Sequence, residues 1–130
     1  YGLGDLDGDG DVDLVVSQVG SLSSFLNDGT GRFTPGPIGS SSATDAQLEL
    51  EDYDGDGRLD VALRYAAAIG SQIELLFGNG TGSFAGTTRV ATPAPVGSFR
   101  ACELDGAPGR ELAIASGASV GVLRHQGQRS

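Results

Sequence analysis

Two acidic runs with the same residue pattern constrain this chain more than any other feature of its sequence. Residues 5–13 read Asp-Leu-Asp-Gly-Asp-Gly-Asp-Val-Asp, and residues 52–60 read Asp-Tyr-Asp-Gly-Asp-Gly-Arg-Leu-Asp. Together they hold nine of the 17 acidic residues of the chain. Crowded carboxylates repel one another and raise one another's pKa. A fold that keeps such a cluster twice is therefore expected to supply a cation.

The spacing within each run indicates which cation is expected. Asp at positions 1, 3 and 5 directs three carboxylates at one centre, and Gly at position 6 permits a sharp reversal. Position 7 offers a backbone carbonyl, and Asp at position 9 closes the shell. These hard oxygen ligands suit calcium better than magnesium, which prefers octahedral geometry with several retained waters. The alternative is a solvated acidic turn that binds nothing, and the second matching copy weighs against it.

The runs are not EF-hand loops, because that motif requires a bidentate Glu at position 12 and flanking helices. Position 12 is Val16 in the first run and Leu63 in the second. The residues that follow, 13–17 and 60–64, are typical of β-strands. We therefore expect each run to join two strands.

The runs also mark an internal repeat. Their first aspartates are 47 residues apart, and the glycine-rich turns at 27–33 and 78–84 are 51 residues apart, so the second copy has about four extra residues near 66–70. Asn-Asp-Gly and Asn-Gly favour hairpins, because these residues tolerate positive φ. Each copy predicts strand, acidic loop, strand, turn, strand, glycine hairpin, strand. The proline-containing segments 34–37 and 92–95 are expected to link the copies, because proline ends a strand.

A third copy is degenerate. Its loop, residues 103–111, has Ala107 and Pro108 at positions 5 and 6. Ala107 offers no ligand, and the fixed φ of Pro108 cannot supply the reversal that glycine allows. We expect this loop to be metal-free, with Arg110 neutralising its acidic neighbours Glu103, Asp105 or Glu111. Strands are predicted at 99–102, 112–115 and 120–123, with no fourth strand.

The acidic loop, the strand that follows it and the Gly-Thr-Gly-x-Phe turn together resemble the FG-GAP/VCBS repeat family. Those repeats form the calcium-binding propeller of integrin α-subunits and propellers in many bacterial surface and secreted proteins. The resemblance implies an all-β fold of antiparallel four-stranded β-propeller blades, with about three repeats forming a partial propeller. The repeats would span residues 1–44, 45–95 and 96–130.

The resemblance also implies two Ca²⁺ ions, one in each intact loop. In the first site, the ligands would be the side chains of Asp5, Asp7, Asp9 and Asp13 and the backbone carbonyl of Asp11. In the second, they would be the side chains of Asp52, Asp54, Asp56 and Asp60 and the backbone carbonyl of Arg58. The Asp11 side chain is expected to be exposed, because Arg58 occupies its place in the second loop.

The charge of the chain narrows its expected partners. A net charge of -9 disfavours nucleic acid, because a phosphate backbone requires a basic patch. Membrane insertion is not expected either, since no stretch approaches the roughly 20 apolar residues of a spanning helix. The expected partner is a protein or glycan ligand. Fewer than three complete blades cannot close a propeller, so further repeats or self-association through blade edges are also expected.

Three single residues receive separate interpretations. Cys102 cannot form an internal disulfide and is expected to be a buried, inert thiol. His125, the only histidine, has no catalytic partner nearby in sequence and is expected to be packed or solvated. Asn79 begins an N-glycosylation pattern, but turn formation explains it better, because the matching turn of the first copy lacks that pattern.

These features predict a calcium-stabilised extracellular module for binding, adhesion or scaffolding, without enzymatic activity. Weak extracellular calcium sites fill only where calcium is near-millimolar, which predicts a secreted or cell-surface location. Two alternatives stay open. One is an accessory propeller domain of a secreted polysaccharide-active enzyme, and the other is a structural subunit of an extracellular filament.

Overall fold

The chain folds into β-strands separated by tight turns and loops. The computed structural model describes residues 1–41, 47–92 and 95–124. Within those ranges, no helix has the length and hydropathy needed to cross a membrane. The strands are β1 (Gly2–Gly4), β2 (Asp13–Gln18), β3 (Ser21–Asn27), β4 (Phe33–Ser40), β5 (Gln47–Glu51), β6 (Asp60–Ala66), β7 (Ser71–Gly78), β8 (Phe84–Thr92), β9 (Ser98–Cys102), β10 (Glu111–Ser116) and β11 (Ser119–Leu123).

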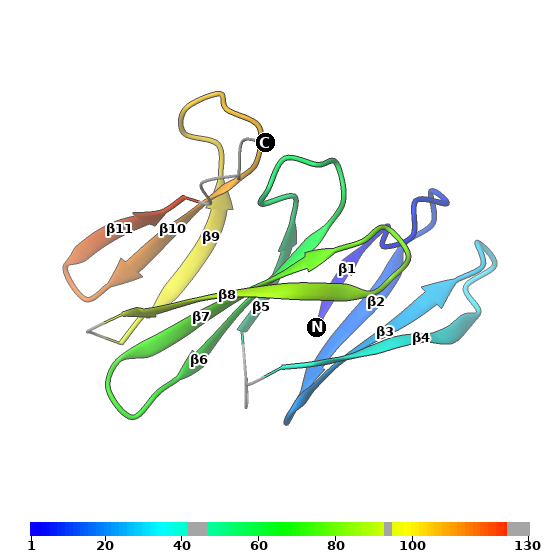
Figure 1. Cartoon of the computed structure of the whole chain (residues 1–130), viewed down its shortest axis with the longest axis horizontal. Helices are drawn as coiled ribbons and strands as arrows, with labels where there is room; N and C mark the ends of the chain where they lie inside the picture. Colours follow the sequence, from blue (N-terminus) through cyan, green and yellow to red (C-terminus); the bar gives the residue numbers. More distant parts are fainter. Residues whose placement is uncertain (42–46, 93–94, 125–130) are drawn as a thin grey trace.

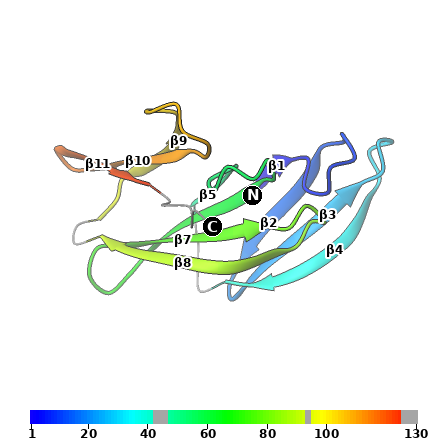
Figure 2. The same cartoon turned by 45° about the horizontal axis from the view of Figure 1, so that its top comes forward.

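The strands form three antiparallel sheets, each built from strands that are consecutive in sequence. Sheet 1 has the order β1-β2-β3-β4, sheet 2 the order β5-β6-β7-β8, and sheet 3 the order β9-β10-β11. The sheets follow one another across the molecule in chain order (Figure 1), and the turned view shows the same succession (Figure 2). The predicted four-stranded antiparallel unit is confirmed for the first two copies. The described part of the third copy has the three strands that its sequence predicts.

The extra length of the second copy lies in the β6–β7 hairpin. Residues 19–20 connect β2 to β3, whereas residues 67–70 connect β6 to β7. In addition, β6 has 7 residues against 6 in β2, and β7 has 8 against 7 in β3. The extension near residues 66–70 is therefore confirmed.

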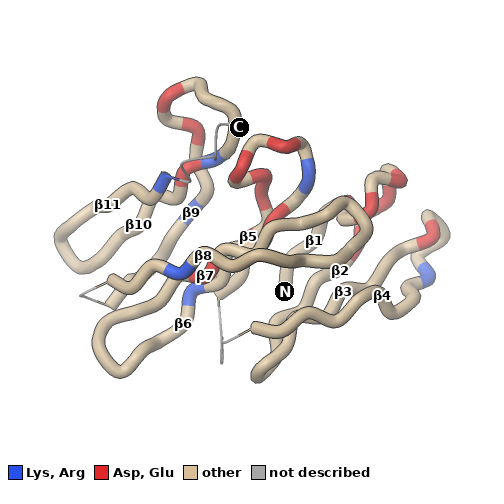
Figure 3. Tube along the Cα trace, in the orientation of Figure 1, with Lys and Arg blue, Asp and Glu red and all other residues tan. Residues whose placement is uncertain are grey.

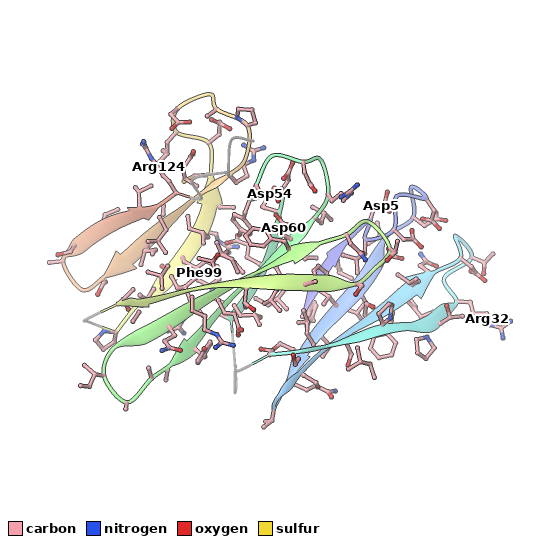
Figure 4. The ribbon with its side chains drawn as sticks, in the orientation of Figure 1. Asp5, Arg32, Asp54, Asp60, Phe99 and Arg124 are labelled. Carbon is pink, nitrogen blue, oxygen red and sulfur yellow. The ribbon has the colours of Figure 1, made fainter. Side chains whose placement is uncertain are left out.

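Apolar side chains fill both spaces between neighbouring sheets. Because successive side chains of a strand point to opposite faces, sheet 2 contributes to both cores. Val61 and Leu63 belong to the core shared with sheet 1, whereas Ala62 belongs to the core shared with sheet 3. Phe99, on β9, is 1% exposed and packs in the second core (Figure 4). Sheet 2 is thus covered on both faces.

The first strand lies close against sheet 2 because two of its three residues are glycine. A Cβ atom at Gly2 would lie 2.6 Å from Leu48 Cδ2, and one at Gly4 would overlap Leu59. Leu3 points the other way and is 58% exposed. Glycine is required here to leave room for the leucines of the neighbouring sheet.

The expectation for the first inter-repeat link is wrong. Residues 34–37 lie inside β4, not between repeats. Proline is tolerated there because β4 is the edge strand of sheet 1 and needs ladder bonds on one side only. The register between β3 and β4 shifts between Ser23 and Phe25, and Ser24 Oγ donates a 3.0 Å hydrogen bond to the Pro37 carbonyl. In the second link, Pro93 lies outside the described residues.

Candidate metal centres

The three loops of the sequence repeat occupy equivalent places in the fold. The first loop (residues 5–13), the second loop (52–60) and the third loop (103–111) each connect the first strand of a sheet to its second strand. All three lie on the same side of the molecule (Figure 1), where acidic residues gather (Figure 3). The repeat therefore presents its carboxylates along one edge.

The carboxylate at position 1 holds the turn of each intact loop. In the first loop, the Gly8 and Gly10 amides donate to Asp5 Oδ1 and Oδ2 at 2.7 and 3.0 Å. In the second loop, the matching amides donate to Asp52 Oδ1 and Oδ2 at 2.7 and 2.8 Å. The position-6 glycines have φ of 92° and 87°. The predicted glycine-dependent reversal is confirmed.

The carboxylate at position 9 joins the loop to the sheet. Asp13 and Asp60 are fully buried, with 0% exposure. Asp13 accepts hydrogen bonds from the Leu6 amide at 2.7 Å and from the Asn27 amide, at the end of β3, at 2.8 Å. Asp60 accepts the two equivalent bonds, each at 2.8 Å. The loop thus remains tied to two strands of its own sheet.

Three carboxylates converge in each intact loop. One oxygen each of Asp5, Asp7 and Asp13 lies within 4.8 Å of the others, and Asp52, Asp54 and Asp60 form the same group. Asp5 labels the position of the first group in Figure 4, and Asp54 and Asp60 label the second. Among the described residues, none of these six side chains pairs with a basic side chain. The two groups therefore offer concentrated, uncompensated oxygen donors.

Desolvation, with a smaller contribution from neighbouring carboxylates, raises the pKa of one aspartate in each intact loop. Desolvation, followed by the carboxylates of Asp9, Asp13 and Asp5, raises the pKa of Asp7 above its ordinary value. Burial raises the pKa of Asp60 to about 6, and the Asp54 carboxylate adds to that effect. Hydrogen bonds from the Gly78 and Tyr53 amides act in the opposite direction. A cation between these groups would relieve the repulsion.

The carboxylates at position 5 lie outside the two groups. Asp9 and Asp56 are exposed, and each accepts a 2.9 Å hydrogen bond from the amide two residues later. Asp56 also pairs with the Arg58 guanidinium at 3.2 Å. Their predicted ligand roles, and those of the Asp11 and Arg58 carbonyls, stay predictions.

The side chain at position 7 differs from expectation in the first loop. Asp11 is half-buried, because its carboxylate lies against Gly29 of the β3–β4 hairpin, where a Cβ atom would be 2.6 Å from Oδ2. Arg58 is exposed and lies over the equivalent Gly80. The expectation of an exposed Asp11 side chain is therefore wrong.

The third loop gathers carboxylates but also supplies arginines. Oxygens of Glu103, Asp105 and Glu111 lie within 4.8 Å of one another. Arg110 lies 3.7 Å from Glu103, as the sequence predicted, and Arg124 lies 3.5 Å from Asp105. Guanidinium groups thus neutralise part of this cluster. That the loop is metal-free stays a prediction.

Two of the single-residue interpretations can be compared with the structure. Cys102 is half-buried rather than buried, and its Sγ donates to the Glu111 carbonyl at 3.4 Å. Asn79 Oδ1 accepts hydrogen bonds from the Thr81 amide and hydroxyl at 3.0 and 2.7 Å, which confirms its role in the turn. His125 lies outside the described residues.

The apolar side chain at position 2 has a role in the core that the motif did not predict. Leu6 is 4% exposed and lies in the core between sheets 1 and 2, and Tyr53 is 2% exposed and lies in the core between sheets 2 and 3. The available signal was a large apolar residue inside an otherwise polar run. Tyr53 also lines a cavity of about 260 Å³, and its buried hydroxyl has no hydrogen-bond partner among the described residues. Burial, together with Glu49 and Glu51, raises the pKa of Tyr53.

Comparison with known proteins agrees with the repeat geometry. Residues 5–63 match the family model of the FG-GAP-like repeat. That range contains both intact loops and the strands between them. The chain matches no curated protein and no solved structure. Over residues 5–63, the chain is therefore similar to the FG-GAP-like repeat.

Proposed function

We propose that the first and second loops each bind one Ca²⁺ ion, and that the chain is a calcium-stabilised, non-catalytic module for extracellular binding or scaffolding. One observation carries the proposal: two equivalent groups of three carboxylates converge without a basic partner among the described residues. The third loop provides the contrast, because two of its three carboxylates, Glu103 and Asp105, are paired with Arg110 and Arg124.

The donors at both sites fit calcium. Each group consists of carboxylate oxygens, the hard ligands that calcium takes in flexible geometry. Asp5, Asp7 and Asp13 would hold the ion in the first site, and Asp52, Asp54 and Asp60 in the second. When bound, calcium would neutralise the mutual repulsion of these side chains. Backbone amides already orient the carboxylates at positions 1 and 9, so calcium binding would require little further ordering of these side chains.

The arrangement of the sheets supports an assignment as β-propeller blades. Each sheet has its strands in chain order, and sheets 1 and 2 each pack a face on the sheet that follows. A four-stranded antiparallel sheet repeated in this way is the unit of a propeller. The acidic loops would then lie along one rim of the assembly.

An extracellular location follows from the proposed role of calcium. Sites of this class fill where free calcium is near-millimolar, and such levels occur outside cells. The ion would act structurally, because the carboxylates at positions 1 and 9 hold loop amides in place. The surface that binds a protein or glycan would then be kept rigid by the loops.

Isothermal titration calorimetry and thermal unfolding test the metal proposal directly. We expect two calcium ions per chain and a higher Tm in calcium than in chelator, with a smaller effect of magnesium. Free calcium about 100-fold above Kd would add roughly 2.7 kcal/mol per site. No heat of binding and no Tm change at about 1 mM calcium, the extracellular range, would contradict the proposal.

A separate measurement addresses the binding role. The chain, held in calcium, is applied to immobilised glycans and to extracellular matrix proteins, with the chelated chain as control. Calcium-dependent, saturable binding to one class supports the module proposal. Turnover of a polysaccharide by the isolated chain would contradict its non-catalytic part.

A further inference from the structure

The Asn79 side chain uses only one of its two polar atoms in the β7–β8 hairpin. Its Oδ1 accepts hydrogen bonds from the Thr81 amide and hydroxyl at 3.0 and 2.7 Å. Its Nδ2 donates to no acceptor among the described residues, and the residue is exposed. Asn27, the other asparagine of the chain, differs, because its Nδ2 donates to the Val12 carbonyl at 3.1 Å. The nitrogen of Asn79 is therefore accessible.

The matching hairpin of the first copy shows that the turn does not need this nitrogen. Asp28 holds the equivalent place in the β3–β4 hairpin, where its Oδ1 accepts hydrogen bonds from the Thr30 amide and hydroxyl at 3.0 and 2.6 Å. A side-chain oxygen is thus sufficient for the turn. Turn formation explains the oxygen of Asn79 and leaves its nitrogen without a structural role.

The Thr81 hydroxyl lies where a reaction at this nitrogen requires it. Residues 79–81 read Asn-Gly-Thr, the acceptor pattern for N-linked glycans. An amide nitrogen is a weak nucleophile, because its lone pair is shared with the carbonyl group. A hydroxyl that donates to Oδ1 stabilises the negative charge that develops on this oxygen as Nδ2 loses a proton. The turn is made within three residues, so it does not depend on the rest of the sheet.

We propose that Asn79 is the acceptor of an N-linked oligosaccharide. In the transfer, Nδ2 forms a bond to C1 of the first sugar, and the bond between C1 and the diphosphate of a lipid-linked donor breaks. The lipid diphosphate leaves with the bonding electron pair, and the proton of Nδ2 passes to a base of the transferase. The inference rests on the extracellular location proposed above, because this pattern is an acceptor in secreted proteins.

The glycan extends from the edge of the molecule that holds the acidic loops. The hairpin contacts both intact loops, because the Gly82 amide donates to the Leu6 carbonyl at 3.0 Å and the Gly78 amide donates to Asp60 Oδ1 at 2.8 Å. Asn79 belongs to neither group of carboxylates. Attachment therefore leaves both proposed calcium sites intact and places a bulky polar group beside them.

Four variants separate the acceptor from the turn. Asn79→Asp removes the acceptor nitrogen and keeps the oxygen of the turn, as Asp28 does in the first copy. Thr81→Ala removes the hydroxyl, and Thr81→Ser retains it. Asp28→Asn places the same three-residue pattern in the matching exposed turn. Without a glycan, Asn79→Asp and the unchanged chain should have the same Tm.

Intact-mass measurement tests the proposal. Each chain is produced behind a cleavable signal sequence in a eukaryotic host, and its mass is measured in the medium and in the cells, before and after treatment with an N-glycosidase. We expect one glycan on the unchanged chain and, at equal or lower occupancy, on Thr81→Ser. We expect none on Asn79→Asp or Thr81→Ala, and a second glycan on Asp28→Asn.

An unchanged chain without a glycan in both fractions overturns the proposal, and so does a glycan that persists in Asn79→Asp. A glycan on Thr81→Ala overturns the role of the hydroxyl. Calcium calorimetry on Asn79→Asp separates this inference from the proposed function. Two bound ions, together with an unchanged chain that carries no glycan, contradict the inference alone. A glycan on the unchanged chain without calcium binding contradicts the metal proposal alone.

Discussion

The backbone amide of Tyr53 donates a 2.8 Å hydrogen bond to Asp60 Oδ2, which joins the second residue of the second loop to its last. The same bond joins position 2 to position 9 at 2.7 Å in the first loop and at 2.9 Å in the third. It is present even in the third loop, where Ala107 and Pro108 replace the Asp and Gly of positions 5 and 6. The position-9 carboxylate therefore has a structural use that does not depend on a cation.

Replacing Asp60 should destabilise the protein with or without calcium. In Asp60→Ala the Tyr53 and Gly78 amides lose their acceptor inside the fold, and each unsatisfied buried group costs about 1–3 kcal/mol. Chemical denaturation in chelator measures the loss. Asp56→Ala is the control, because Asp56 is exposed and should change stability little. Equal stability of the two variants in chelator would contradict this role.

Replacing the carboxylate at position 3 should act mainly through the metal. Asp7→Ala and Asp54→Ala are each expected to remove one calcium site, so calorimetry should find one ion where the unchanged chain binds two. Each variant should lower Tm in calcium much more than in chelator, because the position-3 carboxylate would stabilise the fold by holding the ion, and in chelator that contribution is absent. An undiminished stoichiometry would show that position 3 is not a ligand.

The effect of calcium on stability should grow with pH. Burial raises the pKa of Asp60 to about 6, so the folded state holds this proton more tightly than the unfolded chain does. In chelator, this tighter proton binding stabilises the folded state fully below the unfolded pKa of about 3.9. The stabilisation is lost as the pH rises through the pKa of Asp60 in the folded state. Calcium requires the ionised carboxylate. The Tm difference between calcium and chelator should therefore increase from about pH 5 to about pH 7.5, and a constant difference would be inconsistent with ligation by Asp60.

The third loop should bind no calcium. Glu103 and Asp105 are paired with Arg110 and Arg124, and Ala107 offers no oxygen from its side chain. The double variant Asp7→Ala/Asp54→Ala, which lacks position 3 in both intact loops, isolates the third loop. We expect no heat of calcium binding from this variant. Residual binding that disappears on the further change Asp105→Ala would place an ion in the third loop.

Two glycines at the same loop position should differ in their tolerance of a side chain. Gly8 and Gly55 have φ of 83° and 80°, so alanine costs about 1–2 kcal/mol of backbone strain at either. A Cβ atom at Gly8 meets nothing within 4 Å, but one at Gly55 would lie 2.7 Å from Pro108 Cβ. Gly55→Ala should therefore lose more stability than Gly8→Ala in denaturant unfolding. Equal losses would mean that the second and third loops are not in contact.

The repeat pattern predicted those parts of the fold that depend on local chemistry. Turn residues and alternating apolar residues can be recognised in one sequence, and the strands that follow both intact loops, like the three strands of the third copy, lie close to their predicted positions. The prolines of β4 led to a wrong prediction of a link, because the destabilisation that a proline causes in a strand depends on whether the strand has one neighbour or two. That Pro35 lies on an edge strand is a property of the whole sheet.

The sites were predictable in composition but not in arrangement. The sequence identified every acidic residue of both loops, yet it did not separate Asp5, Asp7 and Asp13, which converge, from Asp9, which faces solvent. Which carboxylates converge depends on the hydrogen bonds that backbone amides donate within the loop, because these bonds set the direction of each side chain. The burial of Asp11 against Gly29 depends on the β3–β4 hairpin folding back over the loop, a contact between distant residues.

The side chain at position 2 has a consequence for the cooperativity of unfolding. Tyr53 belongs at once to the second loop and to the core between sheets 2 and 3, and the Arg110 amide donates to the Asp52 carbonyl beside it at 2.9 Å. In a chain of stacked repeats, the contacts between neighbours determine whether units melt one by one or together. A loop that is ordered in one sheet therefore also orders the interface with the next sheet. Through these loops, neighbouring sheets are expected to unfold together rather than one by one.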